Sequence, residues 1–218
     1  MIDEPTYNFS EAAKYMRIPV ATLRSWILGR DYPKGESSAF FEPLIELPES
    51  ESKLLSFNNL VEVYVLSSLR HEHGVSIKNV RKALDYAELE FGIPRLLLSS
   101  ELRTAIGTIF IERYGKLINM SRSGQLALKI VFENHLKRID WENKIPVRFY
   151  PFIYVDNNKS IAIDPSIQFG RPIIRRKGIL TSVIADRIDA GESILSVAKD
   201  YEINKQEVEL AIRYERAA

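Results

Sequence analysis

The chain has 218 residues and a formal net charge of +1, from 30 Lys/Arg and 29 Asp/Glu, and 45% of its residues are hydrophobic. This length suffices for one large domain or two to three small ones, with ample apolar residues for real cores. No apolar run approaches the roughly 20 residues of a membrane span, and no signal-peptide pattern is present. The absence of cysteine excludes disulfides and thiolate metal sites and fits a cytoplasmic protein. Because the charge is nearly balanced, any nucleic-acid surface must be local.

Residues 7–27 predict two short helices around a tight turn, which is the pattern of a helix-turn-helix. We expect Ser10 to cap the first helix, and the run from Arg17 to Pro19 to end it. The second helix begins near Val20 and carries an apolar stripe at helical spacing, made by Val20, Leu23 and Ile27. Three of its residues face away from that stripe and suit bases and phosphates: Thr22, Arg24 and Ser25.

The same segment carries a local excess of positive charge. Between residues 14 and 34 the basic residues are Lys14, Arg17, Arg24, Arg30 and Lys34, and the acid is Asp31. DNA binding needs such a field. The pattern therefore predicts a DNA interface formed by Arg17, Thr22, Arg24, Ser25 and Arg30. An ordinary helical hairpin with a solvated basic face is the alternative, since short helix-turn-helix patterns also arise by chance.

A β-hairpin wing is expected next, with strands in 40–47 and 53–57. The acidic tip between them argues against phosphate contact there. Two helices follow, one carrying an apolar stripe from Leu60 to Leu69 and one running from about Ser76 to Gly92.

This order of elements resembles the DNA-binding domain of MerR-type regulators. The resemblance rests on Phe9-Ser-Glu-Ala-Ala13, Val20-Ala-Thr-Leu-Arg24, Leu55-Ser-Phe57 and Gly74-Val-Ser-Ile77-Lys. It implies that Thr22, Arg24 and Ser25 lie at the DNA. MerR proteins usually continue into a long dimerising helix, whereas this chain has Ile93-Pro94, which puts dimerisation through that coiled coil in question.

The middle segment has mixed character. Residues 108–114 and 116–120 have strand-like composition around Gly115 and suggest a hairpin. A helix is expected from about Ser123 to Ile139, and the run from Pro146 to Pro151 can only be extended.

The last third carries a second recognisable pattern. The run from Ile161 to Ile179 is followed by three expected helices, at 183–190, 193–201 and 205–214, the last capped by Asn204. Asp164-Pro165, Gly170-Arg-Pro-Ile-Ile174, Ala190-Gly-Glu-Ser-Ile194 and Asp200-Tyr-Glu-Ile203 at these spacings resemble the prokaryotic family catalogued as domain of unknown function four-three-three. The family implies a small winged or trihelical fold, and many members are antitoxins encoded beside a PIN-like ribonuclease toxin.

Together the two halves resemble the larger VapB-type antitoxins. The chain departs from the family in a more basic loop after Gly-Arg-Pro and in a helical pattern that runs to its last residues instead of a flexible tail. Because of this second departure, we expect a folded surface to neutralise the toxin. We expect the charged contacts to come from the basic loop, because PIN-like nucleases hold metal with acidic clusters. These contacts are Arg171, Arg175, Arg176 and Lys177. A structural ion pair of Arg171 with Asp164, or DNA contact by the loop, are the alternatives.

The last helices are acidic, with four basic residues against six acids in 192–216. An acidic helix is a poor phosphate binder. We therefore interpret this second helix-turn-helix as a protein-binding or dimerisation module before a DNA-binding one.

No catalytic pattern emerges: no phosphate-cradling glycine loop, no Gly-x-Ser-x-Gly turn and no metal site, since His71 and His73 cannot share a helix face. We expect no cofactor. The sequence thus predicts an α+β, mainly α, protein with a winged helix-turn-helix domain at 1–92, a mixed segment at 93–152 and an antitoxin-family domain at 153–218. The expected function is an antitoxin that binds a PIN-like toxin and, as a homodimer, its operator DNA. The alternative is a stand-alone MerR-like regulator whose middle segment binds an effector.

Overall fold

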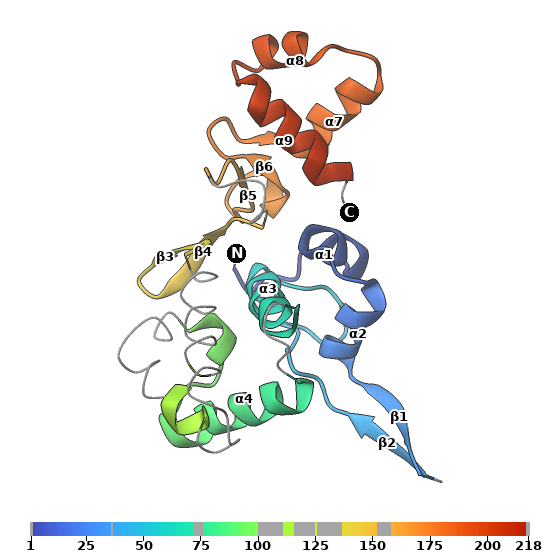
Figure 1. The fold of residues 1–218 in the computed structure, drawn as a ribbon, viewed down its shortest axis with the longest axis vertical. Coiled ribbons are helices and arrows are strands. Elements are labelled where there is room, and N and C mark those ends of the chain that lie inside the picture. Colours follow the sequence, from blue (N-terminus) through green and yellow to red (C-terminus); the bar gives the residue numbers. More distant parts are fainter. Residues whose placement is uncertain are drawn as a thin grey trace.

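The computed structural model describes residues 2–35, 37–71, 76–99, 111–115, 125, 137–151 and 158–216. A helix-turn-helix and a central helix form the N-terminal part, a small hairpin follows in the middle, and a meander with three helices forms the C-terminal part (Figure 1).

The helix-turn-helix consists of α1 (Phe9–Met16) and α2 (Val20–Leu28). Asn8 caps α1: its side chain accepts a hydrogen bond from the Glu11 amide at 2.9 Å, and the Glu11 carboxylate accepts one from the Asn8 amide at 3.0 Å. The prediction that Ser10 caps this helix was wrong. A capping box needs an acid or amide three residues after the cap, and Ser10 is followed at that spacing by alanine. Both helices were otherwise predicted.

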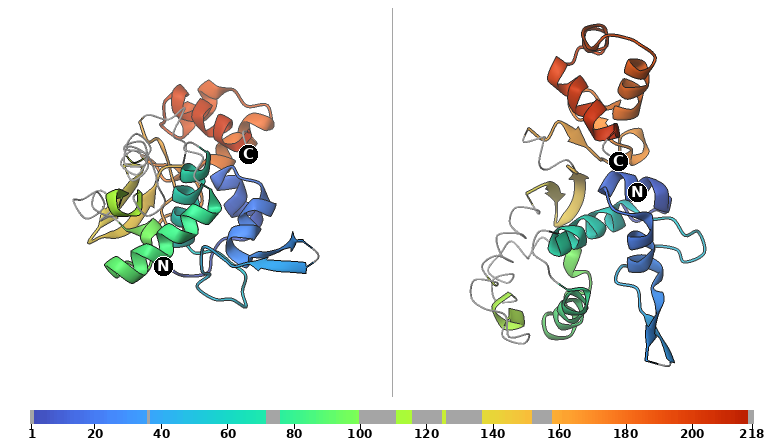
Figure 2. Two further views of the ribbon diagram at one scale, coloured as in Figure 1. Left: turned by 60° about the horizontal axis from the view of Figure 1, so that its bottom comes forward. Right: turned by 45° about the vertical axis from the view of Figure 1, so that its right-hand side comes forward.

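A hairpin of β1 (Arg30–Lys34) and β2 (Ser37–Phe41) follows α2 directly and projects from the body of the molecule (Figures 1 and 2). Gly29 permits this early start, because its φ is +73° and a Cβ there would lie 2.4 Å from the Phe41 carbonyl oxygen. The prediction of wing strands at 40–47 and 53–57 was therefore wrong, because the hairpin strands lie earlier in the chain. Residues 44–54 form a loop, since Pro43 and Pro48 remove backbone donors that strands would need.

Two longer helices complete the N-terminal part, as predicted. Helix α3 (Phe57–His71) lies at its centre and is buried along most of its length. Helix α4 (Ile77–Phe91) is amphipathic, with Ser76 as its N-cap and Gly92 as a left-handed C-cap. A short 3₁₀ turn, η1 (Leu96–Leu98), then returns the chain to α3.

The middle segment differs from its prediction. Residues 111–115 are helical, not a strand; the buried residues Ile111 and Tyr114 are three apart, which is helical spacing. The expected helix at 123–139 is described only at Gln125 and at its end, where β3 (Ile139–Glu142) begins instead. The rest of both predictions lies outside the described residues. Strand β3 pairs with β4 (Ile145–Phe149), which fits the extended run expected from Pro146.

The C-terminal part begins with an antiparallel meander of β5 (Ile161–Ala162), β6 (Ile173–Ile174) and β7 (Ile179–Leu180). Helices α7 (Thr181–Asp189), α8 (Ile194–Asp200) and α9 (Lys205–Arg216) follow, as the sequence predicted. The Asn204 side chain accepts a hydrogen bond from the Glu207 amide at 2.8 Å and confirms the predicted cap.

The hydrophobic core is divided unequally. One cluster joins α1 to α4 with the middle hairpin, where the rings of Tyr64 and Phe149 lie 4.5 Å apart. A separate cluster fills the space among α7, α8 and α9. The middle segment therefore packs on the N-terminal core, whereas the C-terminal helices have a core of their own.

A polar contact joins the two parts, which we call the α1–α9 seam. Lys14 pairs with Glu215 at 2.8 Å, and the Tyr214 hydroxyl donates to the Tyr15 carbonyl at 3.3 Å. Burial raises the pKa of Tyr214 well above its ordinary value, with Glu215 and Tyr15 acting in the same direction. The end of α9 lies beside α1 as a result (Figure 1).

Candidate nucleic-acid interface

The outward side of α2 carries the predicted contact residues. Leu23, Trp26 and Ile27 are buried against the core, while Arg24 is exposed. Its guanidinium lies 5.6 Å from the centroid of the Phe9 ring. This stacking limits the rotamers of Arg24 without using its hydrogen-bond donors, so the side chain is partly oriented toward a ligand in advance. Thr22 and Ser25 are half-buried on the same helix.

A groove of about 520 Å³ opens at the end of α2, between the β1–β2 hairpin and the first turns of α4. We call it the basic groove; its walls are Ser25, Arg30, Tyr32, Phe41, Ile77, Lys78 and Arg81. The hairpin register explains the hairpin's share, because Arg30 stands opposite Phe41 and Tyr32 opposite Ala39. Alternate residues of a strand share one face, so Arg30 and Tyr32 both line this wall.

The basic groove contains three cations and no carboxylate among its walls. Arg81 donates to the carbonyl oxygens of Glu42 and Pro43 and lies 5.0 Å from the Phe41 ring centroid, so it is fixed without being neutralised. Within the described parts of the chain, Arg30 and Lys78 also have no acidic partner. A fixed cluster of cations at the end of a reading helix is suited to the sugar–phosphate backbone of DNA.

Sequence reasoning found part of this surface. Ser25 and Arg30 belong to the predicted set and line the basic groove. On α2, Thr22 lies about one turn before Ser25, and Arg24 directly precedes Ser25. It missed Lys78 and Arg81. Their spacing of three on an amphipathic helix was the available signal, but only the fold brings that helix beside α2.

Arg17 lies elsewhere. It ends α1 in the left-handed conformation, and its guanidinium lies 5.3 Å from the Tyr214 ring centroid and donates to the Tyr214 carbonyl at 3.4 Å. Burial lowers the pKa of Arg17, and Tyr214 opposes this shift. The structure thus places Arg17 in the α1–α9 seam, apart from the other predicted DNA contacts.

The predicted partner-binding loop divides into two kinds of residue. Arg176 pairs with Glu207 at 3.3 Å and Lys177 with Glu202 at 2.6 Å, so both are tied to the start of α9. Arg175 lies over the Tyr150 ring, 5.8 Å from its centroid. Arg171 is exposed and donates to the Gln168 carbonyl at 3.3 Å. Of these four loop residues, Arg171 and Arg175 therefore have no carboxylate partner among the described residues.

The alternative in which Arg171 pairs with Asp164 was wrong. Arg148 of β4 takes that position and donates twice to one Asp164 oxygen, at 2.9 and 2.7 Å. The other oxygen accepts from the Ser166 amide at 2.9 Å. Because β4 lies next to β5 through the Phe149–Ile163 bridge, the nearer strand supplies the partner.

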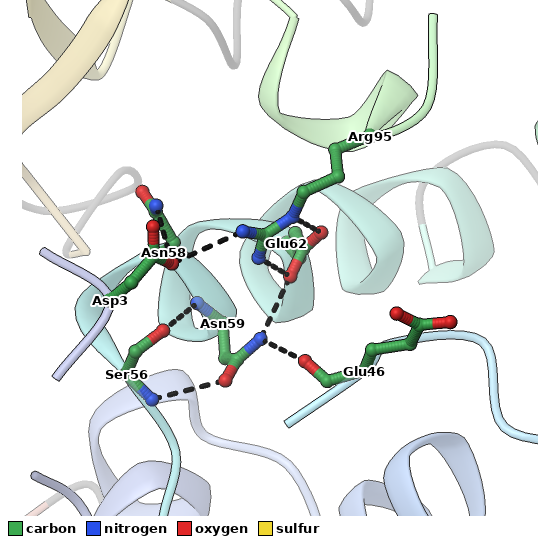
Figure 3. A network of polar contacts seen from close by, with 7 residues as sticks. All are labelled: Asp3, Glu46, Ser56, Asn58, Asn59, Glu62 and Arg95. Carbon is green, nitrogen blue, oxygen red and sulfur yellow. Dashed lines mark hydrogen bonds and ion pairs between the residues drawn. The ribbon is translucent and has the colours of Figure 1, made fainter. Parts of the chain in front are cut away.

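A buried polar network stabilises α3 where the N-terminal residues meet η1 (Figure 3). Ser56 and Asn59 cap the helix reciprocally, at 3.1 and 3.2 Å. Arg95 donates to both Glu62 oxygens, at 3.0 and 2.8 Å, and pairs with Asp3 at 3.1 Å. Burial raises the pKa of Glu62, and Arg95 opposes this shift. The pair holds η1 on α3 and is structural.

Two further properties bear on function. Among the residues that the structure describes, no group of three or more His, Asp or Glu side chains is placed to hold a metal ion. No described helix is long and apolar enough to cross a membrane.

The fold and the basic groove define a class: an α+β protein that joins a helix-turn-helix to a second, smaller helical domain. Comparisons with known families agree. Residues 5–84 match a family described as "Putative DNA-binding HTH domain", and residues 161–214 match one described as "Protein of unknown function (DUF433)".

Full-length relatives carry the same two parts of the chain. The chain is 28% identical over 228 residues to "Putative antitoxin VapB45" of Mycobacterium tuberculosis, covering 96% of this chain and 93% of that protein. It is 24% identical over 225 residues to "Uncharacterized protein Rv2308" of the same organism, covering 98% and 91%. The X-ray crystal structure of Rv2018 from Mycobacterium tuberculosis has the same fold, with a TM-score of 0.71, 23% identity and coverage of 97% of this chain and 99% of that one.

These findings confirm the resemblance to VapB-type antitoxins, with an N-terminal helix-turn-helix and a C-terminal DUF433 domain. They also confirm the α+β class with a helix-turn-helix near the N-terminus. The likeness to MerR regulators stays a prediction.

Proposed function

We propose that this chain is an antitoxin that binds operator DNA through α2 and the basic groove and holds a cognate toxin through its C-terminal half. The observation that carries the proposal is the similarity to a VapB-type antitoxin over 96% of the chain, which includes both domains in one order. We further propose that it acts in the cytoplasm and represses transcription of its own genes. We also propose that it binds DNA as a homodimer, since paired reading helices match two-fold operators.

The DNA half of the proposal is supported by geometry and charge together. Thr22 and Arg24 lie on the outward side of α2, and the cations of the basic groove continue that surface toward the hairpin. We infer that α2 reads bases while Arg30, Lys78 and Arg81 hold phosphates. The test is a gel-shift titration of the full chain on the DNA upstream of its own gene, with scrambled DNA of equal length as the control. Equal affinity for both would contradict operator recognition.

The toxin half rests on the exposed cations of the C-terminal loop. A PIN-like ribonuclease holds metal with clustered acids, and Arg171 and Arg175 have no carboxylate partner in the part of the chain that the structure describes. We expect a folded surface to supply most of the affinity through apolar contacts, with these cations accelerating association. Co-expression with the adjacent open reading frame, followed by co-purification, tests this half. Failure of the two products to co-purify would favour the second candidate.

The second candidate is a stand-alone regulator with an effector site in the middle segment. A pocket of about 600 Å³ beside β3 supports it, with walls formed by Lys137, Ile139, Asp140, Trp141 and Lys159. Lys159 pairs with Asp140 at 3.6 Å, so Lys137 beside the Trp141 ring is the group that suits a small anionic effector. In that case DNA binding would respond to a small molecule and no partner protein would be needed.

A further inference from the structure

The turn at 168–171, which we call the Phe169 tip, presents a bare aromatic ring to solvent. Phe169 is 81% exposed. Gln168, Phe169 and Gly170 all have positive φ, at 50°, 55° and 70°. Two of these are non-glycine residues in a conformation that L-amino acids rarely adopt, and such strain persists only where the surroundings impose it.

The surroundings hold the Phe169 tip from both sides. On one side, Arg148 fixes Asp164, whose second oxygen accepts hydrogen bonds from Ser166. On the other side, the Tyr7 hydroxyl donates to the Gly170 carbonyl at 3.1 Å, and a Cβ at Gly170 would lie 1.9 Å from that hydroxyl. The tip is therefore a rigid projection, so little conformational freedom remains to be lost when a partner binds it.

The tip has the composition of a protein-binding anchor. It combines an exposed phenyl ring with an exposed guanidinium, that of Arg171, which has no carboxylate partner among the described residues. Aromatic residues and arginine dominate the energetic centres of protein interfaces. A polyanionic partner is disfavoured, because residues 158–216 hold ten Lys/Arg and nine Asp/Glu and offer no positive field.

The chain itself contains a complementary pocket of about 720 Å³ between α4, η1 and the loop before α3, which we call the acidic pocket. Apolar side chains contribute to its walls, among them Leu44, Leu47, Leu84, Leu96 and Leu97. Glu46, Asp85 and Glu88 also line it, and no described cation pairs with them. Of its two arginines, Arg95 pairs with Glu62, whereas Arg81 contacts backbone carbonyls and keeps its charge. The acids of the walls outnumber these two cations.

We propose that two copies of this chain associate by placing the Phe169 tip of each in the acidic pocket of the other. The ring of Phe169 meets the apolar walls, and the Arg171 guanidinium faces Asp85 and Glu88. In this dimer Arg171 is occupied, and Arg175 remains as the loop cation for the toxin. The basic groove could not take this role, because no carboxylate among its walls would face Arg171.

A two-fold interface requires that tip and pocket belong to one surface region. The N-terminal segment limits their separation: Asp3 lines the acidic pocket, Tyr7 binds Gly170 in the tip, and the four residue steps from one to the other span at most about 14 Å. The reciprocal arrangement buries each tip once and closes at two copies, so no edge is left for further growth.

The test is sedimentation equilibrium of the full chain over a range of concentrations. The wild type should dimerise, and Phe169→Ala should weaken the dimer at least about tenfold, as expected for an interface anchor. Leu89→Ala is the matched control: Leu89 is 82% exposed on α4 and does not line the pocket. Circular dichroism verifies the fold of each variant.

Charge reversal gives a sharper result. Arg171→Glu alone and Asp85→Lys with Glu88→Lys should each be monomeric, because like charges then meet at both contacts. An equimolar mixture of these two variants should dimerise, since every tip then finds a pocket of opposite charge. Lys205→Glu reverses a charge at an exposed position of α9 and should leave dimerisation unchanged. A monomeric wild type, growth beyond a dimer, an unchanged Phe169→Ala dimer or a mixture that stays monomeric would each overturn the proposal. The inference rests on the homodimer of the proposed function: a monomeric wild type would contradict both, whereas an unchanged Phe169→Ala dimer or a mixture that stays monomeric would contradict this interface alone.

Discussion

The N-terminal helix-turn-helix region and the C-terminal helical region differ in the groups that their cations contact. In the N-terminal region, Arg24 and Arg81 contact ring faces and Arg81 contacts backbone carbonyls, so their charges remain. In the C-terminal region four cations meet carboxylates: Arg176 with Glu207, Lys177 with Glu202, Arg187 with Glu192 and Asp200, and Arg216 with Asp189. The remaining cations of residues 158–216 stand among nearly as many acids in total. The N-terminal region therefore carries cations that keep their charge, whereas the C-terminal region has a nearly neutral surface.

This difference shows that helix arrangement alone does not assign a ligand. A polyanion binds where cations are fixed but not neutralised, whereas a nearly neutral surface with apolar anchors suits a protein. The acid-rich composition of 192–216 already favoured a protein partner for the second region, and that assignment stays a prediction. Equal effects of the C-terminal cations and of the basic-groove cations on DNA affinity would contradict this distinction.

Reversing two cations of the basic groove is expected to have the largest effect. Arg30→Glu with Lys78→Glu should weaken operator binding by about one hundredfold or more, because attraction to phosphate becomes repulsion. Removing both charges by alanine should reduce the salt slope by about 1.8. Fluorescence anisotropy at several salt concentrations measures both. The matched control is Lys199→Glu with Lys205→Glu in the C-terminal region, which should leave the affinity and the slope unchanged.

Truncation on the reading helix should have a smaller effect. Arg24→Ala is expected to cost about 1–3 kcal/mol of operator binding if Arg24 reads a base, and to reduce the salt slope if it holds a phosphate. A gel-shift titration on operator and mutated operator separates the two cases. Unchanged binding by a normally folded variant would remove Arg24 from the interface.

The contact between the two regions can be tested at Gly170. Gly170→Ala should lower the free energy of unfolding by about 1–3 kcal/mol, since the new methyl displaces the Tyr7 hydroxyl and φ at this position is +70°. Chemical denaturation monitors the loss. Gly191→Ala is a suitable comparison, because its φ is also positive but nothing lies within 4 Å of the new Cβ. Equal losses at both sites would show that backbone strain alone is responsible.

The basic residues of the C-terminal loop should affect the rate of association with the toxin more than the lifetime of the complex. Arg175→Glu is expected to slow toxin association and change its salt dependence while affecting dissociation less. Arg176→Glu is the less informative change, because it also disrupts the contact with Glu207 at the start of α9. Surface plasmon resonance at two salt concentrations resolves the rates. An effect confined to dissociation would place Arg175 in the buried centre of an interface.

The smallest expected effect concerns alkaline pH. Because the pKa of Tyr214 is higher in the folded chain than in the unfolded one, its stabilising contribution is complete below about pH 10 and declines above it, by up to about 1.4 kcal/mol per pH unit. Tyr214→Phe should flatten the fall in melting temperature above that pH. The burial that raises the pKa of Tyr15 to about 12 gives a similar but separate contribution. An identical pH profile in the variant would contradict a buried, neutral Tyr214.

Local sequence patterns determined much of this protein. Periodicity placed α1 to α4 and α7 to α9, because 3.6-residue spacing acts over a few residues. The cap at Asn204 was also predicted correctly, whereas the one at Ser10 was wrong. They also identified Ser25 and Arg30 as part of a basic surface. Family patterns at both ends of the chain identified its resemblance to VapB-type antitoxins, since such motifs depend on residue type and spacing.

Contacts between distant residues were decided by the tertiary structure alone. The hairpin starts at Arg30 because Gly29 fits beneath Phe41, and Asp164 pairs with Arg148 because β4 lies beside β5. Arg17 stacks on Tyr214, almost two hundred residues away, and so lies apart from the predicted DNA contacts, while Lys78 and Arg81 line the basic groove from α4. A cation remains unpaired or is neutralised according to whether the fold places a carboxylate beside it. That is a property of packing, and no local pattern encodes it.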